Sequence, residues 1–178
     1  MRLTDYTDYS LRVLLYLAVR GAELSTIQDI SEAYGISRNH LMKVVQQLGE
    51  RGWVETVRGR KGGLRLREQS RALTVGEVVR ATESDFALVG CLPDHQGERR
   101  FCVITPHCRL RSALQAASNA FLAELDRYTI DEVAQPHAPL AALLGLSNVI
   151  PIKPLAPLAS VAPPAPLPSG DGDATPPS

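Results

Sequence analysis

The sequence lacks any apolar run long enough to cross a lipid bilayer. Its longest strongly apolar segment, Val13–Val19, lies between Arg12 and Arg20 and is far shorter than the ~20 residues that a membrane-spanning helix needs. Polar and acidic residues precede this segment and no small-residue cleavage site follows it, which argues against a cleaved secretory signal. We therefore expect a cytoplasmic protein with no membrane partner.

Cysteine is also scarce. The 178 residues include only three cysteines, and an odd number in a cytoplasmic protein argues against a disulfide framework. The sequence has no glycine loop for nucleotides, no nucleophile motif and no paired-histidine motif. These absences argue against an enzyme. The alternative outside transcriptional regulation is a metal- or thiol-bearing enzyme or electron carrier.

Proline is almost absent from the first three quarters of the chain. Only Pro93 and Pro106 precede Pro136, and the other prolines lie from Pro136 to Pro177. A proline-rich segment cannot donate regular backbone hydrogen bonds and favours extended polyproline II. We therefore predict a disordered tail over residues 134–178.

The chain has no net charge, since 19 Lys and Arg balance 19 Asp and Glu, but the charges are unevenly distributed. Residues 36–71 contain nine basic and three acidic residues, a local net charge of +6. A basic patch of this kind is typical of a surface that binds nucleic acid.

The apolar spacing predicts a mainly α-helical fold. We expect a largely buried helix over 5–20, then two short helices over 25–34 and 38–50. The period then changes to alternation over 53–57 and 64–67, which predicts a two-stranded hairpin with a basic, glycine-rich tip. A short helix, a tight turn, a second helix and a basic hairpin together predict a winged helix-turn-helix, which we assign with its flanking helices to a DNA-binding domain over residues 1–83.

Helix caps refine these boundaries. Ser25 and Gln28 have the spacing of a capping box, Gly35 supplies the turn, and Ser37 caps the next helix. Thr74 caps a further helix over roughly 75–82.

A long helix follows an irregular segment over residues 84–108. It is predicted from about Arg109 to Tyr128. Its apolar seam has intervals of three and four residues and consists of Leu110, Leu114, Ala117, Phe121, Leu125 and Tyr128. A single helix on a small domain cannot bury such a seam alone, so we assign residues 109–133 to homodimerisation.

The second helix of a helix-turn-helix enters the major groove of double-stranded DNA, and a symmetric dimer reads a palindromic operator. Arginine pairs with guanine and asparagine or glutamine with adenine, while a basic wing contacts phosphates or the minor groove. The candidate DNA-binding residues are Gln28, Ser37, Arg38, Asn39, His40, Lys43, Gln46, Arg58, Arg60 and Lys61.

The three cysteines, Cys91, Cys102 and Cys108, lie in the irregular segment and not on an apolar helix face, which would be usual for buried structural thiols. Three thiolates on one loop can bind one metal centre and leave a fourth position for a weaker ligand. Their spacing fits neither a zinc ribbon nor a bacterial ferredoxin. The residues themselves leave zinc, an iron–sulfur cluster and a thiol redox switch open.

Several parts of the sequence together resemble the NsrR family of nitric-oxide-sensing iron–sulfur repressors, which are relatives of IscR. They are the opening MRLTDYTDYSLRVLLYLA, the segment ISRNHLMKVV, the wing RGRKGGLRL and the three-cysteine loop. The resemblance implies a dimeric winged-helix repressor with an iron–sulfur cluster, 4Fe–4S in well-defined members and 2Fe–2S in others. Nitrosylation of the cluster by nitric oxide then abolishes operator binding and derepresses nitrosative-stress genes. An alternative within regulation is a sensor of redox state or cluster supply, closer to IscR; a winged-helix scaffold without a cofactor is a third.

The resemblance also implies cluster ligands. The three cysteines match the family's cluster thiolates, and Asp8 matches a carboxylate that serves as fourth ligand from the partner subunit. One departure is the gap of ten residues after the first cysteine, where the family has five. Added loop length costs little entropy, so ligation remains feasible, but it brings His95 near, and His107 adjoins Cys108. Either histidine could replace Asp8; the histidine position of IscR is Arg111 here.

Overall fold

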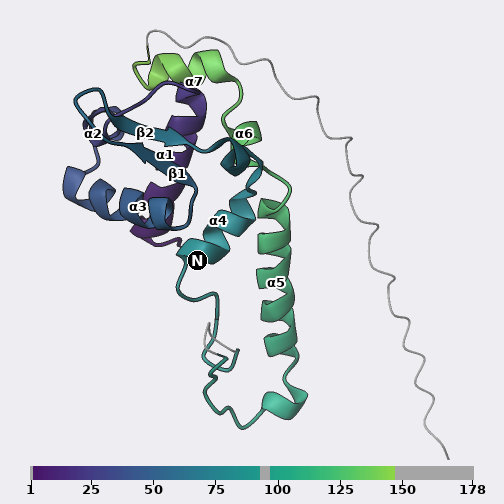
Figure 1. The fold of residues 1–178 in the computed structure, drawn as a ribbon. Helices are drawn as coiled ribbons and strands as arrows, with labels where there is room; N and C mark the ends of the chain where they lie inside the picture. The colour runs from purple at the N-terminus through teal and green to yellow at the C-terminus, as the bar shows by residue number, and fades with distance from the viewer. Residues whose placement is uncertain (1, 93–96, 147–178) are drawn as a thin grey trace, which may run out of the picture.

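The fold is seen in a computed structural model that describes residues 2–92 and 97–146 (Figure 1). In this part of the chain the elements are helices and one two-stranded sheet. In chain order the elements are α1 (Asp5–Arg20), α2 (Ile27–Tyr34), α3 (Arg38–Glu50), β1 (Val54–Val57), β2 (Gly63–Leu66), the 3-10 helix η1 (Glu68–Ala72), α4 (Val75–Thr82), the 3-10 helix η2 (Thr105–His107), α5 (Arg109–Leu125), α6 (Ile130–Val133) and α7 (His137–Leu143).

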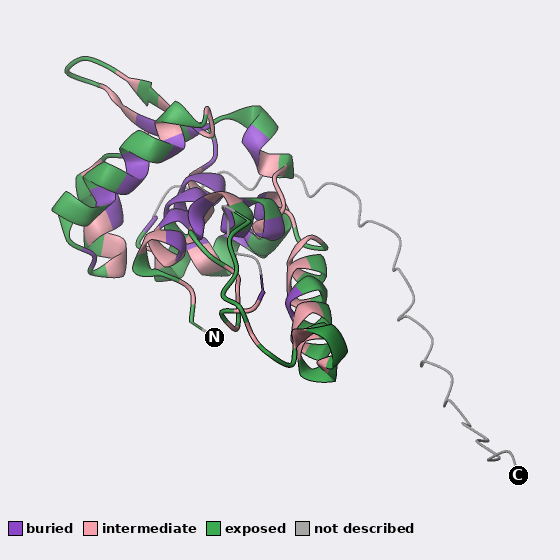
Figure 2. Ribbon diagram, turned by 90° about the horizontal axis from the view of Figure 1, so that it is seen from below, coloured by how far each residue is buried: buried purple, intermediate pink, exposed green. Residues whose placement is uncertain are grey.

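Helix α1 lies at the centre of the domain and supplies much of its core. Val13, Leu14 and Leu17 are completely buried, and α1 packs against α3, α4, α6, α7 and β2. Figure 2 shows the buried residues concentrated where these elements meet. Fully burying one such side chain contributes about 1.5–3 kcal/mol, which explains why so apolar a helix takes this position. The prediction of a largely buried helix over 5–20 is confirmed.

The predicted winged helix-turn-helix is also confirmed. Gly35 ends α2 in the left-handed conformation, with φ 66° and ψ 25°, and so turns the chain into α3. Strands β1 and β2 pair antiparallel, with Val54 opposite Leu66 and Val57 opposite Gly63. Val54 and Leu66 are buried, so the inner face of the hairpin packs against the helices, while its tip extends away from them (Figure 2).

Two predicted caps are corrected by the structure. Thr26, not Ser25, caps α2: its side chain accepts from the Asp29 N–H, and Asp29 in turn accepts from the Thr26 N–H. Ser25 is instead bridged to β2, donating its N–H to the Leu64 carbonyl at 2.9 Å and accepting the Leu64 N–H at 2.7 Å. Ser37 does occupy the N-cap position of α3, but its side chain makes no capping hydrogen bond.

The long helix predicted to reach Tyr128 ends at Leu125. Thr129 and Glu132 form a capping box that starts the short helix α6, so the chain breaks its helical path just before it. The segment assigned to dimerisation over residues 109–133 therefore contains two helices and not one.

The prediction of a disordered tail from residue 134 is wrong for residues 134–146. Helix α7 packs on α1, and Ala134, Ala141 and Leu146 are buried in the core. The prolines do not prevent this helix, because Pro136 occupies the N-cap of α7 and Pro139 its first turn, where no backbone N–H is required within the helix. Residues 147–178 lie outside the described residues. Within the described ranges, none of the helices is both apolar and long enough for a membrane span.

Candidate functional site

The outer face of α3 is exposed and mostly polar. The inner face of α3 is anchored in the core by four buried side chains, those of Leu41, Val44, Val45 and Leu48. The predicted DNA-binding residues of the helix-turn-helix are all exposed, namely Gln28, Ser37, Arg38, Asn39, His40, Lys43 and Gln46. Gln28 donates to Glu32 and Gln46 donates to Glu50 at 3.0 Å, so both amides are oriented along their own helices. The structure therefore brings these residues together on α2 and α3, on a surface that can enter a groove.

Helix α1 supports this surface through its aromatic neighbours. The rings of Tyr9 and His40 stack with centroids 6.1 Å apart, which links α1 to the start of α3. The Arg12 guanidinium lies 5.7 Å from the Tyr34 ring at the end of α2. Burial raises the pKa of the Tyr34 hydroxyl to about 12, so this ring stays neutral beside Arg12. Helix α1 is therefore in contact with both helices of the motif through these side chains.

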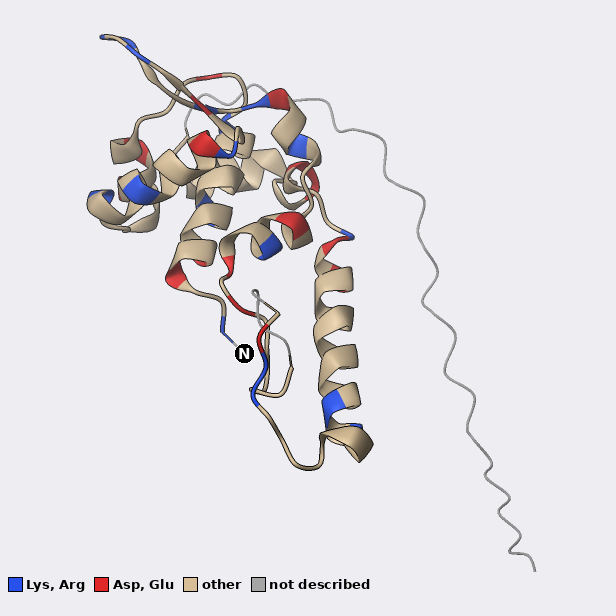
Figure 3. Ribbon diagram, turned by 60° about the horizontal axis from the view of Figure 1, so that its bottom comes forward, with Lys and Arg blue, Asp and Glu red and all other residues tan. Residues whose placement is uncertain are grey.

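The hairpin tip carries the second group of predicted contacts. Arg58, Arg60 and Lys61 are exposed, and none of the three forms an ion pair with a carboxylate of the described ranges. Figure 3 shows the Lys and Arg colouring at this tip. A β-carbon on Gly62 would overlap the Val57 carbonyl, so only glycine allows the tight closure of the tip. Three unneutralised cations on a projecting hairpin suit contact with phosphates.

One pair of charges on the hairpin is internal. Arg65 donates to Glu55 across the two strands at 2.8 Å. The hydrogen bond from Arg65 lowers the pKa of the Glu55 carboxyl. The basic character of the wing therefore comes from its tip and not from its strands.

The three cysteines lie on the segment that connects α4 to α5 (Figure 1). All three are free thiols of intermediate exposure, and Cys108 caps α5, its sulfur accepting from the Arg111 N–H at 3.4 Å. Among the described residues, no three His, Cys, Asp or Glu side chains are grouped closely enough to hold a metal ion. The three cysteines thus lie on one segment, but within the described ranges they are not grouped with one another or with a further ligand as a metal site requires.

The donor set nevertheless fits an iron–sulfur cluster chemically. Thiolates are the usual ligands of such clusters, and a hydrogen bond to a ligand sulfur tunes the cluster's potential. The Nε of Arg111 is buried without a hydrogen-bond partner in the described part of the chain. Arg99, Arg100 and Arg109 are exposed on or beside the same segment, and their positive charge favours thiolates and an anionic group.

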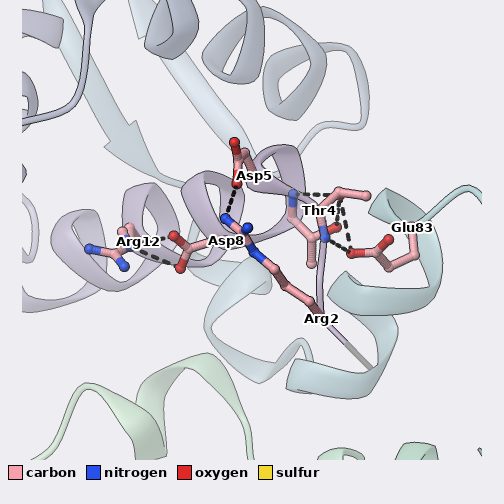
Figure 4. A network of polar contacts seen from close by, with 7 residues as sticks. Arg2, Thr4, Asp5, Asp8, Arg12 and Glu83 are labelled. Atoms are coloured by element: carbon pink, nitrogen blue, oxygen red, sulfur yellow. Dashed lines mark hydrogen bonds and ion pairs between the residues drawn. The ribbon is translucent and has the colours of Figure 1, made fainter.

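Asp8 lies on the accessible side of α1, near its start. Both of its carboxylate oxygens accept from the Arg12 Nε, at 2.9 and 3.0 Å, and the two side chains are 43% and 44% exposed (Figure 4). Asp8 belongs to no three-residue ligand group in the described ranges. Of the two histidine alternatives, His107 is exposed in η2, and His95 lies outside the described residues.

The side chains that connect α4 to its neighbours are not predicted by the sequence. Arg80 binds Asp126 beyond the end of α5, Arg51 donates to the Ala81 carbonyl, and Glu83 accepts from Thr4. The residues of each pair are 30 to 79 positions apart, and no local pattern in the sequence signals such a pairing.

Comparisons with known proteins agree with this geometry. A family model described as Rrf2, iron-dependent transcriptional regulator, matches residues 3–136. The chain is 49% identical over 149 residues to the HTH-type transcriptional regulator NsrR of Bacillus subtilis, covering 83% of this chain and 100% of that protein. It is 47% identical over 145 residues to NsrR of Bacillus licheniformis, covering 81% and 99%. The predicted resemblance to NsrR is confirmed.

Solved structures support the fold. Oxidised CymR of Staphylococcus aureus matches with a TM-score of 0.59 at 23% identity, covering 76% of this chain and 97% of that chain. The structure of T. potens IscR matches with a TM-score of 0.59 at 20% identity, covering 79% and 90%.

Proposed function

The chain belongs to the Rrf2 family of iron-dependent transcriptional regulators, and from this membership we propose that it is a homodimeric repressor that senses nitric oxide through an iron–sulfur cluster. Its affinity for a palindromic operator is high in the cluster-loaded state and low after exposure to nitric oxide. Loss of binding then derepresses nitrosative-stress genes.

The observation that carries the proposal is that one domain presents both an exposed recognition helix, α3, and a basic wing. Arg38 and Asn39 are exposed at the start of α3, where side chains reach base edges. Arginine recognises guanine O6 and N7, and asparagine recognises adenine. The exposed cations of the tip add phosphate contacts, which give affinity without sequence preference.

Helix α5 supports a dimer. Its seam is only partly covered in the single chain: Leu110 is 64% exposed, while Leu114, Phe121 and Leu125 are half-buried. A second copy related by a twofold axis would bury the same face from both sides. That symmetry would also present two copies of α3 to half-sites about 34 Å apart.

The residues proposed to hold the cluster are Cys91, Cys102 and Cys108, with Asp8 of the partner subunit as the fourth ligand. When bound, the cluster supplies iron that reacts with nitric oxide. Asp8 and Tyr9 are adjacent on α1, and Tyr9 stacks on His40. If the Asp8 carboxylate were bound to the cluster of the other protomer, α1 would be held in place beside His40. A carboxylate released from the cluster would return to Arg12.

Fluorescence anisotropy with a palindromic operator tests this function. Protein reconstituted without oxygen should bind, and addition of nitric oxide should lower the affinity at least about tenfold, within the range usual for coupled sites. Cluster-free Cys91→Ala protein should bind weakly with or without nitric oxide. Equal affinity before and after nitric oxide would refute the sensing role, and release on oxidation alone would favour the sensor of redox state or cluster supply.

A further inference from the structure

The C-terminal end of α4 is a junction of three connections. Arg80 forms a bidentate ion pair with Asp126, which directly follows α5; the Nη1 and Oδ1 atoms are 2.7 Å apart. The Ala81 carbonyl accepts from Arg51 Nη2 at 2.6 Å. Glu83 accepts from the Thr4 N–H at 2.7 Å and from its hydroxyl at 3.1 Å (Figure 4). Within four residues α4 is therefore tied to the end of α5, the end of α3 and the start of α1.

This junction is also where the cysteine segment begins, since residue 84 follows Glu83 directly. Glu83 is buried, and its N–H donates to the Val79 carbonyl at 2.9 Å, so the first step of the segment is continuous with the helix. The cysteine segment is therefore joined directly to this turn of α4.

Arg51 is the connection to the DNA-reading helix. It follows α3 directly, and its N–H donates to the Gln47 carbonyl at 3.1 Å, which continues the helical pattern of α3. Its guanidinium lies 5.7 Å from the ring centre of Trp53, the only tryptophan. The far end of the side chain binds one of the last carbonyls of α4, which lack partners within their own helix and carry partial negative charge.

Arg51 thus differs from the other basic residues of the module. It is one of the nine cations in residues 36–71, and composition alone would count it toward DNA. Its guanidinium donates to a backbone carbonyl of α4, whereas Arg58, Arg60 and Lys61 are exposed on the wing and form no ion pair in the described part of the chain.

We propose that Arg51 is a positioning residue that couples the recognition helix to the start of the cysteine segment through Ala81, and that it makes no contact with DNA. The inference rests on the proposed function, because it names the contact through which loss of the cluster would change the position of α3. Since the inner face of α3 is packed in the core, removing the Arg51 contact leaves the helix folded but uncouples its end from α4.

The test compares Arg51→Met with Arg51→Lys and with the control Arg65→Met. Methionine keeps an apolar side chain over Trp53 but donates no hydrogen bond, and lysine restores a charged donor. Arg65→Met removes the same charge from the same module at a residue whose ion-pair partner is Glu55, not α4. Operator affinity is measured for cluster-loaded and demetallated full-length protein at several salt concentrations, after thermal melting confirms that each variant is folded.

For Arg51→Met we expect the ratio of the two affinities to fall about tenfold, while the slope of log affinity against log salt stays as in the wild type. Arg51→Lys should recover most of the ratio, and Arg65→Met should keep it. An equal loss in both states together with a slope smaller by about 0.9 would identify Arg51 as a phosphate contact and overturn the inference.

Hydrogen exchange supplies a readout that does not need the cluster. In demetallated Arg51→Met protein, amides of the last turn of α4, Glu83 among them, should exchange several-fold faster than in the wild type. Unchanged exchange would overturn the inference. If the wild type itself binds the operator equally with and without the cluster, the proposed function fails, and the exchange rates and the salt slope decide the role of Arg51 on their own.

Discussion

Gly76 in α4 lies directly against the side chain of Asp126, which follows α5. A β-carbon on Gly76 would lie 2.8 Å from Asp126 Cγ and would overlap its Oδ1. That carboxylate is held by Arg80 and by the Thr74 hydroxyl, so it has little freedom to move away. The absence of a side chain at residue 76 therefore allows α4 and α5 to be joined by an ion pair.

We predict that Gly76→Ala lowers the free energy of unfolding by about 1–3 kcal/mol, the usual cost of overpacking. The matched control is Gly49→Ala in α3, where a β-carbon would meet only the Val54 carbonyl at 3.9 Å. Relief of glycine's conformational entropy should make that change neutral or stabilising by about 0.4–1 kcal/mol. Urea unfolding measures both, and equal effects of the two substitutions would contradict the close contact.

Asp8→Ala should leave stability nearly unchanged. Its pair with Arg12 is over 40% exposed on both sides, and surface pairs of this kind contribute about 0–1 kcal/mol. If Asp8 is the fourth cluster ligand, the visible absorption of the reconstituted protein should instead be lost several-fold faster to an iron chelator.

The control for this experiment is Asp5→Ala. Asp5 shares the first turn of α1 and pairs with the exposed Arg2 at 3.0 Å, so charge and helix dipole change equally. Equal loss of the absorption in both variants would remove Asp8 from the ligand set and turn attention to His107.

The sequence predicted those parts of the fold that depend on local periodicity. The spacing of Leu41, Val44, Val45 and Leu48 was sufficient for α3, and alternation was sufficient for the hairpin. The start of α2 was harder to predict, because adjacent Ser25 and Thr26 are both good caps and the bridge to Leu64 selects between them.

Long-range contacts could not be predicted in this way. Residues 134–146 are ordered because Ala141 and Leu146 pack into the core beside α1. Proline content gives no information about such packing. For the site, the exposed residues of α3 and the wing followed from the motif. The placement of the cysteines could not be predicted from it, because their segment has no regular spacing and no three ligands come together among the described residues.

His137 makes stability depend on pH. Its ring is buried, and neither ring nitrogen has a hydrogen-bond partner in the described part of the chain. Burial lowers the pKa of His137; nearby Arg71 also lowers it, while Asp131 opposes the shift. Below its unfolded pKa of about 6.5 the unfolded chain binds a proton that the folded chain resists, so this residue's contribution is complete above that pH and is lost as pH falls toward the lowered value.

We therefore predict that the wild type loses more stability between pH 7 and pH 5 than His137→Phe, which has no group to protonate. Urea unfolding at a series of pH values measures the difference. Parallel pH profiles for the wild type and His137→Phe would show that the ring is solvated.

Arg60→Ala should weaken binding to operator and to unrelated DNA by the same factor. Arg60 is exposed at the hairpin tip without a carboxylate partner in the described ranges, so its charge is free to neutralise a phosphate, and losing one such contact reduces the salt slope by about 0.9. Arg38→Ala, at the start of α3, should instead reduce operator affinity more than nonspecific affinity, because base contacts carry the discrimination. Arg127→Ala controls for net charge, since Arg127 is paired with Glu124 close to the end of α5. Anisotropy at several salt concentrations separates these outcomes: if Arg60→Ala bound both DNAs with the wild-type slope, the wing would not contact the backbone, and recognition would depend on α3 alone.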